Sequence, residues 1–248
     1  MVASTVFRQR AAARWHTILG VSHHLTLRRS VAAVVCVVFA AIALTVLRDH
    51  AAAGVSRCEK FRLAAADPAR TELSTARGGP RILVIGDSYS LGLGVESGQS
   101  WPHRLKGRVI VDGFSGSGFS RDASQCGDVS YASRAITGLR RGGDVSLVVV
   151  EGGLNDYDQS TSAIRRGFDL LLTRLTGRRV VVVGPASAPS RAREVPRIDA
   201  LLARLSARHG VQYVRMSGET FPYLPDRLHL TPAGQRAFGD LVAARITG

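Results

Sequence analysis

Residues 81–90 read RILVIGDSYS, an apolar run that stops at Gly86, Asp87 and Ser88. A continuous apolar run such as Ile82–Ile85 is typical of a strand that is covered on both faces, as in a parallel sheet. The Gly-Asp-Ser that follows is either an ordinary turn or the site of a serine nucleophile at the end of a strand. The two interpretations differ in what they require at the ends of the other strands.

Four further runs rich in valine predict strands of the same kind: Val109–Val111, Val145–Val150, Val180–Val183 and Val211–Val214. Between them, apolar residues recur at helical spacing, at Ile164, Phe168, Leu171, Leu172 and Leu175, then at Ile198, Leu201, Leu202 and Leu205, and finally at Ala237, Phe238, Leu241, Val242 and Ile246. Thr231 and Pro232 predict the N-cap and first turn of the last helix. This alternation predicts a three-layer α/β domain with a five-stranded parallel sheet.

Reactive residue types follow three of the predicted strands and precede the last helix. The second strand leads into DGFSGSGFS (112–120), the third leads into EGGLNDYD (151–158), and the last helix is preceded by PDRLHLTPAG (225–234). Because ligands bind beyond the carboxyl ends of the strands in such sheets, we expect these segments to meet at one site.

The residue types in these segments suit acyl transfer by a serine. A serine hydroxyl is a poor nucleophile at neutral pH and needs an adjacent base, for which His229 has a suitable side chain. Asp226, three residues earlier, is placed to hold the imidazole in one tautomer. We therefore expect Ser88, His229 and Asp226 to form a catalytic triad.

The same reaction needs donors for the developing oxyanion. Candidates are the backbone N–H groups of Ser88 and Gly116 and the side-chain amide of Asn155. Gly118 and Gly113 are alternatives for the glycine. Asp87 and Asp156 are expected to brace the loops rather than to react.

Four segments resemble, in order, the sequence blocks of the SGNH hydrolase superfamily, also called GDSL-type esterases and lipases. They are the nucleophile block GDSYS, the glycine block GFSGSG, the Gly-x-Asn-Asp block at 153–156 and the Asp-x-x-His block at 226–229. The resemblance extends from residue 81 to about 246. It implies a flavodoxin-like sheet and the hydrolysis of ester bonds without a metal or another cofactor. Tyr89 departs from the family pattern, which often has leucine after the serine.

The N-terminal part has a different character. Residues 1–30 contain five arginines and no acid, and residues 31–47 (VAAVVCVVFAAIALTVL) carry no charge. This pattern predicts a cytoplasmic basic end and a transmembrane anchor, with the rest of the chain exported. Residues 48–79 are interpreted as a connector containing a short helix over 55–66, and residues 80–248 as the hydrolase domain. A signal peptide cleaved near Ala53 is the alternative.

Cysteine usage agrees with export. Cys36 lies in the predicted membrane segment, which leaves Cys58 and Cys126 as a pair. In an oxidising compartment these two are expected to form a disulfide, and the alternative is two unrelated thiols.

The composition restricts the partners. The net charge is +14, but the basic residues are scattered and no basic tract contains interleaved aromatic residues, which argues against nucleic acid as a partner. No group of His, Cys and acidic residues has the spacing of metal ligands. An extracytoplasmic serine esterase acting on a small molecule, a lipid or an envelope glycan is therefore the leading interpretation. Its alternatives are an acyltransferase acting on an envelope glycan or glycolipid, and a glycan-binding domain without activity.

Overall fold

The computed structural model describes residues 34–41, 57–74 and 79–246. The chain divides into two units, Met1–Arg57 and Cys58–Gly248. In the first unit, residues 34–41 form a helix with exposed side chains. No helix among the described residues is long and apolar enough to cross a bilayer. Most of the predicted anchor, the basic segment 1–30 and the alternative cleavage site at Ala53 lie outside the described residues.

The second unit contains a six-stranded sheet with the order β1-β3-β2-β4-β5-β6. The strands are β1 (Glu72–Ser74), β2 (Arg81–Gly86), β3 (Arg108–Gly113), β4 (Leu147–Glu151), β5 (Val180–Val183) and β6 (Gln212–Val214). The last five are mutually parallel, as the sequence predicts. The prediction of five strands was nevertheless wrong, because β1 adds an antiparallel edge strand beside β3. Its three residues, ELS, are too short and too polar to show a strand pattern.

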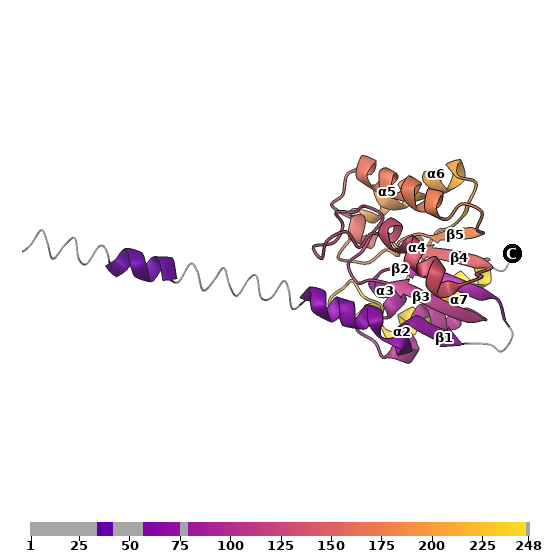
Figure 1. Ribbon diagram of the computed structural model, residues 1–248, viewed down its shortest axis with the longest axis horizontal. Helices are drawn as coiled ribbons and strands as arrows, with labels where there is room; N and C mark the ends of the chain where they lie inside the picture. Colours follow the sequence, from indigo (N-terminus) through magenta and orange to yellow (C-terminus); the bar gives the residue numbers. More distant parts are fainter. Residues whose placement is uncertain (1–33, 42–56, 75–78, 247–248) are drawn as a thin grey trace, which may run out of the picture. The chain divides into compact units, whose positions relative to one another are not determined.

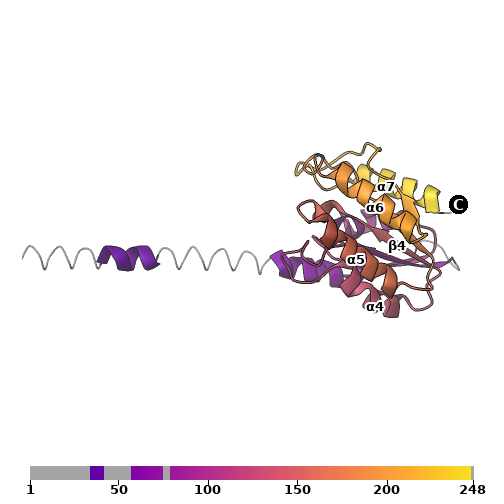
Figure 2. The same ribbon diagram turned by 90° about the horizontal axis from the view of Figure 1, so that it is seen from above.

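Both faces of the sheet are buried, which explains the unbroken apolar runs. In β2, Leu83 and Ile85 pack on one face and Ile82 and Val84 pack on the other. The first face is covered by α4 (Tyr131–Gly142), α5 (Thr161–Arg174) and α6 (Val195–Arg208), and the opposite face is covered mainly by α7 (Pro232–Ile246). Helices α5 and α6 lie side by side (Figures 1 and 2). The predicted three-layer arrangement is therefore confirmed.

The connection from β2 to β3 contains only short helical elements. It consists of α3 (Ser88–Leu91) followed by two short 3-10 helices, η1 (Ser97–Gln99) and η2 (Trp101–Arg104). Gly92 adopts a left-handed conformation and ends α3 after a single turn. The short helix places Ser88 at the end of β2 without a long element covering it.

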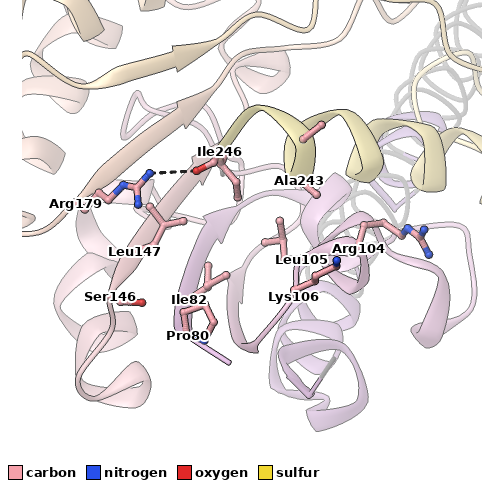
Figure 3. A pocket seen from close by; sticks show the side chains of 11 residues that line it. Pro80, Ile82, Arg104, Leu105, Lys106, Ser146, Leu147, Arg179, Ala243 and Ile246 are labelled. Atoms are coloured by element: carbon pink, nitrogen blue, oxygen red, sulfur yellow. Dashed lines mark hydrogen bonds between the residues drawn. The ribbon is translucent and has the colours of Figure 1, made fainter. Parts of the chain in front are cut away.

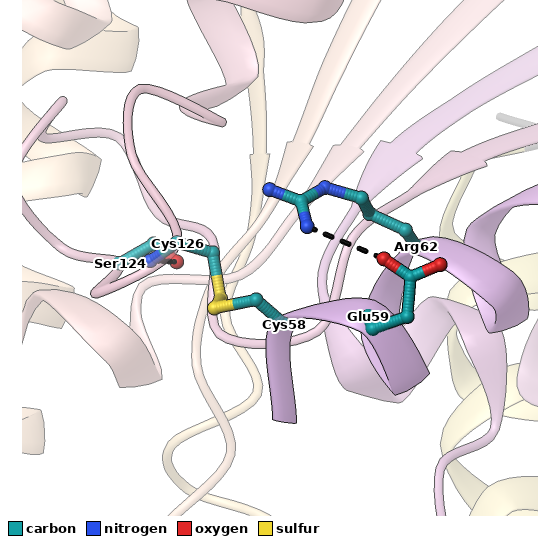
Figure 4. The surroundings of a disulfide bond; sticks show 5 residues. All are labelled: Cys58, Glu59, Arg62, Ser124 and Cys126. Atoms are coloured by element: carbon teal, nitrogen blue, oxygen red, sulfur yellow. Dashed lines mark hydrogen bonds and ion pairs between the residues drawn. A yellow bond between two sulfur atoms is a disulfide. The ribbon is translucent and has the colours of Figure 1, made fainter. Parts of the chain in front are cut away.

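The connector joins the domain in two ways. A helix over residues 57–66, called the connector helix below, lies where the sequence predicts it, and the short helix α2 (Pro68–Thr71) follows it before β1. Cys58 in the connector helix forms a disulfide with Cys126, as expected (Figure 4). The ring of Phe61 also packs edge-on against that of Phe114, with centroids 6.3 Å apart.

We expect the disulfide to stabilise the folded domain. The two cysteines are 68 residues apart in the sequence, and the chain-entropy model predicts a contribution of about 4 kcal/mol for a loop of this length. Replacing both Cys58 and Cys126 with serine should lower the free energy of unfolding, measured in denaturant, by about 2–4 kcal/mol. Cys36→Ser, which leaves the disulfide intact, is the matched control. Equal stability of the double variant and the control would contradict the prediction.

Candidate active site

The reactive segments meet at the carboxyl ends of the central strands. Strand β2 lies between β3 and β4 in the sheet. The strand after β2 is added on one flank, and the strands from β4 onward are added on the other flank, so the strand order reverses at β2. In doubly wound sheets ligands bind at such a switch point. Asp87 and Ser88 directly follow β2, and Asn155 lies in the 3-10 helix η3 (Leu154–Asp156) just after β4.

Ser88 occupies the first position of α3. The side chain of Asp87 caps this helix by accepting a hydrogen bond from the backbone N–H of Tyr89 at 2.9 Å. At the first position of a helix the N–H has no acceptor within the helix. The N–H of Ser88 also has no acceptor elsewhere among the described residues, and it remains available to an oxygen atom of a ligand.

The structure brings Ser88, His229 and Asp226 together in the predicted order. The Nε2 atom of His229 lies 3.0 Å from Oγ of Ser88, and its Nδ1 atom lies 2.6 Å from Oδ2 of Asp226. The two ring nitrogens therefore face a hydroxyl on one side and a carboxylate on the other. This is the arrangement that general-base activation of a serine requires.

The loop that carries His229 is organised by Asp226 itself. The second carboxylate oxygen of Asp226 accepts hydrogen bonds from the backbone N–H groups of Leu228 and His229, both at 2.9 Å. Partial burial raises the pKa of Asp226, but the hydrogen bonds from His229 and Leu228 outweigh it and hold the pKa below its ordinary value. Asp226 is therefore ionised at neutral pH and available to orient the imidazole.

Of the three candidate glycines, Gly116 and Gly118 have N–H groups without an acceptor in the described part of the chain, and only Gly116 is not fully buried. It has a φ of +82°, is half-buried between buried neighbours, and its N–H has no acceptor in the described part of the chain. Gly118 instead packs against Asp156, because a Cβ atom there would lie 2.5 Å from the carboxylate. Gly113 packs against Leu91, because a Cβ atom at Gly113 would lie 2.6 Å from the leucine side chain. Close packing therefore requires glycine at both of these positions.

Asn155 is close to the same site, but its amide already has partners. Its Nδ2 atom donates hydrogen bonds to Oδ2 of Asp87 at 3.0 Å and to the carbonyl oxygen of Ser117 at 2.9 Å. These two acceptors match the two N–H groups of the amide. Donation from Asn155 to an oxyanion therefore requires one of these hydrogen bonds to be shared or exchanged.

Asp87 and Asp156 occupy bracing positions. Asp87 accepts hydrogen bonds from Asn155 and from the hydroxyl of Tyr131, besides the one from Tyr89. Asp156 accepts from the backbone N–H groups of Phe119 (2.9 Å) and Ser120 (2.8 Å), just beyond the glycine loop. Burial raises the pKa of Asp87 to about 6 and that of Asp156 to about 7.

Two residues that sequence reasoning did not select also support the site, the buried Glu151 and the partly buried Arg134. Glu151, at the end of β4, accepts a hydrogen bond from Ser90 at 2.7 Å, and burial raises its pKa well above the ordinary value. Arg134 of α4 donates to the carbonyl oxygen of Gly86 at 2.9 Å and pairs with Asp112 at the end of β3. The only sequence signal for Glu151 is a charged residue directly after a valine run. Arg134 has no such signal.

A cavity of about 670 Å³ lies at the amino ends of the strands, opposite to Ser88 (Figure 3). Its lining includes Ile82 at the start of β2, Leu147 at the start of β4, and Arg179, which donates a hydrogen bond to the carbonyl oxygen of Ile246. The length of β2 separates it from Ser88. Among the described residues, no group of three or more His, Cys, Asp or Glu side chains is placed to hold a metal ion.

The buried Asp156 should make stability depend on pH. In the unfolded chain an aspartate has a pKa of about 4, whereas in the folded protein that of Asp156 is about 7. Between these values unfolding releases a proton, so the free energy of unfolding should fall as pH rises. Asp156→Asn should make this fall less steep, by on the order of 1 kcal/mol per pH unit, in denaturant titrations between pH 4 and 7. The control is Asp144→Asn, which replaces an exposed aspartate that does not influence Asp156. An unchanged slope in Asp156→Asn would contradict the prediction.

Comparisons with known proteins identify the family of this chain. The model of the GDSL-like lipase/acylhydrolase family matches residues 84–237, which is more than half of the chain. No curated protein matches significantly. Similar solved structures include Est24, a carbohydrate acetylesterase from Sinorhizobium meliloti, with 17% identity, a TM-score of 0.60, and coverage of 67% of this chain and 97% of that one. They also include an inhibitor-bound aryl esterase from M. smegmatis, with 18% identity, a TM-score of 0.57, and coverage of 68% and 98%.

At these identities the structural neighbours show a shared fold, and the family model supplies the assignment. Its match begins inside β2, continues through Ser88 and His229, and ends in α7. The chain therefore belongs to the GDSL-like lipase/acylhydrolase family and is an SGNH-type hydrolase.

Proposed function

We propose that the protein is a serine esterase that hydrolyses acyl esters through an acyl-enzyme, with Ser88 as nucleophile. The observation that carries the proposal is the continuous hydrogen-bond chain from Ser88 through His229 to Asp226, with distances of 3.0 and 2.6 Å. Family membership establishes the hydrolase class, and this chain of contacts supports the assignment of roles.

The proposed reaction has two halves. His229 accepts the proton of the Ser88 hydroxyl while Oγ attacks the ester carbonyl carbon, and His229 then gives the proton to the departing alcohol oxygen. A water molecule next attacks the acyl-enzyme, again losing its proton to His229, and the collapse of the second tetrahedral intermediate releases the acid and restores Ser88. The ionised Asp226 stabilises the imidazolium in both halves.

The oxyanion of each intermediate is proposed to lie between the backbone N–H groups of Ser88 and Gly116. Both lack an acceptor among the described residues, so neither has to give up an existing hydrogen bond. The amide of Asn155 is the proposed third donor, and it acts at the expense of its bond to Asp87 or to Ser117.

We further propose that the hydrolase domain works outside the cytoplasm, anchored by residues 31–47 or secreted after cleavage near Ala53. The basic N-terminal residues and the uncharged run after them support export. The Cys58–Cys126 disulfide also supports it, because disulfides persist in oxidising compartments.

An acetyl or other short acyl group on an envelope glycan is the proposed substrate class. The support is the proposed location together with the likeness in fold to a carbohydrate acetylesterase. The same acyl-enzyme could pass its acyl group to a sugar hydroxyl instead of water, which makes an acyltransferase the second candidate. A glycan-binding domain without activity is the third, and the formed hydrogen-bond chain at Ser88 argues against it.

Ser88→Ala should abolish ester hydrolysis. Removing a triad member costs on the order of 10⁴-fold or more in kcat, because the nucleophile and its activation are lost together. The measurement is p-nitrophenyl acetate hydrolysis by wild type and variant, with covalent labelling by a fluorophosphonate in parallel.

The matched control is Ser146→Ala. It removes an exposed serine hydroxyl just before β4, at the end of the strands opposite to Ser88. It should retain the wild-type rate and the wild-type labelling. Equal rates for Ser88→Ala and wild type would remove Ser88 from the mechanism. Absence of both hydrolysis and labelling in the wild type would favour the non-catalytic interpretation.

Hydrolysis and transfer are distinguished by competition for the acyl-enzyme. With p-nitrophenyl acetate and added glycan oligosaccharides, an esterase should release acetate in proportion to p-nitrophenol, because water is the acceptor. An acyltransferase should release less acetate than p-nitrophenol and yield acetylated oligosaccharide, which mass spectrometry detects. Transfer that exceeds hydrolysis would contradict the esterase proposal.

A further inference from the structure

Tyr89 follows Ser88 directly, and its side chain is only 1% exposed. We propose that Tyr89 is a positioning residue for His229, because its hydroxyl holds the peptide group that precedes the imidazole in the orientation that reaches Ser88. This inference rests on the proposed esterase function. It assigns a role to the residue at which the chain departs from the family pattern.

The contact is a hydrogen bond between two distant parts of the sequence. The Tyr89 hydroxyl donates to the carbonyl oxygen of Leu228 at 2.6 Å, across 139 residues of sequence. The other polar group of the same peptide is the N–H of His229, which donates to Asp226 at 2.9 Å. Because a peptide group is planar, bonding both its carbonyl and its N–H fixes the plane from which the His229 side chain departs.

The ring of Tyr89 is itself held firmly. It packs edge-on against Phe238 of α7, with centroids 5.9 Å apart, and its centroid lies 6.3 Å from that of His229. Burial raises the pKa of Tyr89 well above its ordinary value, so the hydroxyl keeps its proton and remains a donor. A buried aromatic side chain with two packed neighbours has little rotational freedom, and its hydroxyl is therefore a fixed point for the loop.

The loop that carries His229 needs such a point. The side chain of Asp226 is 48% exposed, and Arg227 adopts a left-handed conformation with φ of +58°. Several hydrogen bonds of the loop are local, such as that from the N–H of Leu224 to the carbonyl of His229. The Ser190 N–H also holds the carbonyl of Arg227, but the Tyr89 bond acts directly on the peptide that leads into His229.

A leucine after Ser88 would fill apolar space without offering a donor to Leu228. In this chain the hydroxyl therefore connects the nucleophile turn to the base loop. Displacement of reacting groups by about 1 Å can cost up to about 100-fold in rate, so a single hydrogen bond that sets the imidazole direction is sufficient to affect turnover.

The test is Tyr89→Phe in the full chain, with p-nitrophenyl acetate as substrate. Phenylalanine keeps the ring and its packing but removes the donor. We expect kcat to fall about tenfold with KM unchanged, and fluorophosphonate labelling of Ser88 to slow by a similar factor. The matched control is Tyr213→Phe in β6, which removes a partly buried phenol hydroxyl that donates to Asp199 at 2.7 Å. Its kcat and labelling rate should equal those of wild type.

Each outcome decides the inference. A loss of kcat in Tyr89→Phe but not in Tyr213→Phe supports it, because general destabilisation would affect both variants. Unchanged kcat and labelling in Tyr89→Phe would overturn it. A rise in KM without a change in kcat in Tyr89→Phe would also overturn it, because it would indicate that Tyr89 contacts the substrate rather than positions His229. If the wild type is no faster than Ser88→Ala, the proposed function fails and this inference fails with it. Failure of the proposed function is seen in the rate of the wild type, whereas failure of this inference alone is seen in an active wild type and an equally active Tyr89→Phe variant.

Discussion

The buried carboxylate of Asp87 is the interaction on which the arrangement of the site depends. It accepts hydrogen bonds from the N–H of Tyr89, from the amide of Asn155 and from the hydroxyl of Tyr131. These donors belong to helix α3, to η3 after β4 and to α4. One side chain therefore joins the end of β2 to its neighbouring segments. It also fixes the turn between β2 and α3, in which Ser88 lies.

A site built on buried carboxyl groups has an energetic cost. Burial raises the pKa values of Asp87, Glu151 and Asp156, and the charge of Asp87 raises those of the other two further. Each group nevertheless has donors: Ser90 for Glu151, and two backbone N–H groups for Asp156. These hydrogen bonds connect segments that are 36 to 61 residues apart in the sequence. The valine-rich core of the sheet supplies the stability that offsets this cost.

The sequence predicts the parts of this structure that depend on burial patterns and on local motifs. The five parallel strands, the helices α5, α6 and α7, and the meeting of Ser88 with Asp226 and His229 follow from apolar periodicity and from the position of polar residues at strand ends. Strand β1 does not, because three residues with one buried side chain carry no pattern. Nor do the contacts of Arg134, Glu151 and Tyr89, because each depends on how far-separated segments pack. The packing of Gly118 against Asp156 also depends on the fold, because the two residues are far apart in the sequence.

Two aspartates lie near the imidazole, and their environments give them different roles. Asp87 is adjacent to Ser88 in sequence. Burial raises its pKa to about 6, although the charge of His229 acts in the opposite direction, and its oxygens accept hydrogen bonds from Tyr89, Asn155 and Tyr131. Asp226 is half-exposed, and its hydrogen bonds to Leu228 and His229 hold its pKa below the ordinary value. In the proposed mechanism the partner of His229 must stay ionised while the imidazole gains and loses its proton, and Asp226 meets this condition better than Asp87. The same comparison explains why replacing Asp87 would disturb loop geometry first, whereas replacing Asp226 would act directly on the base.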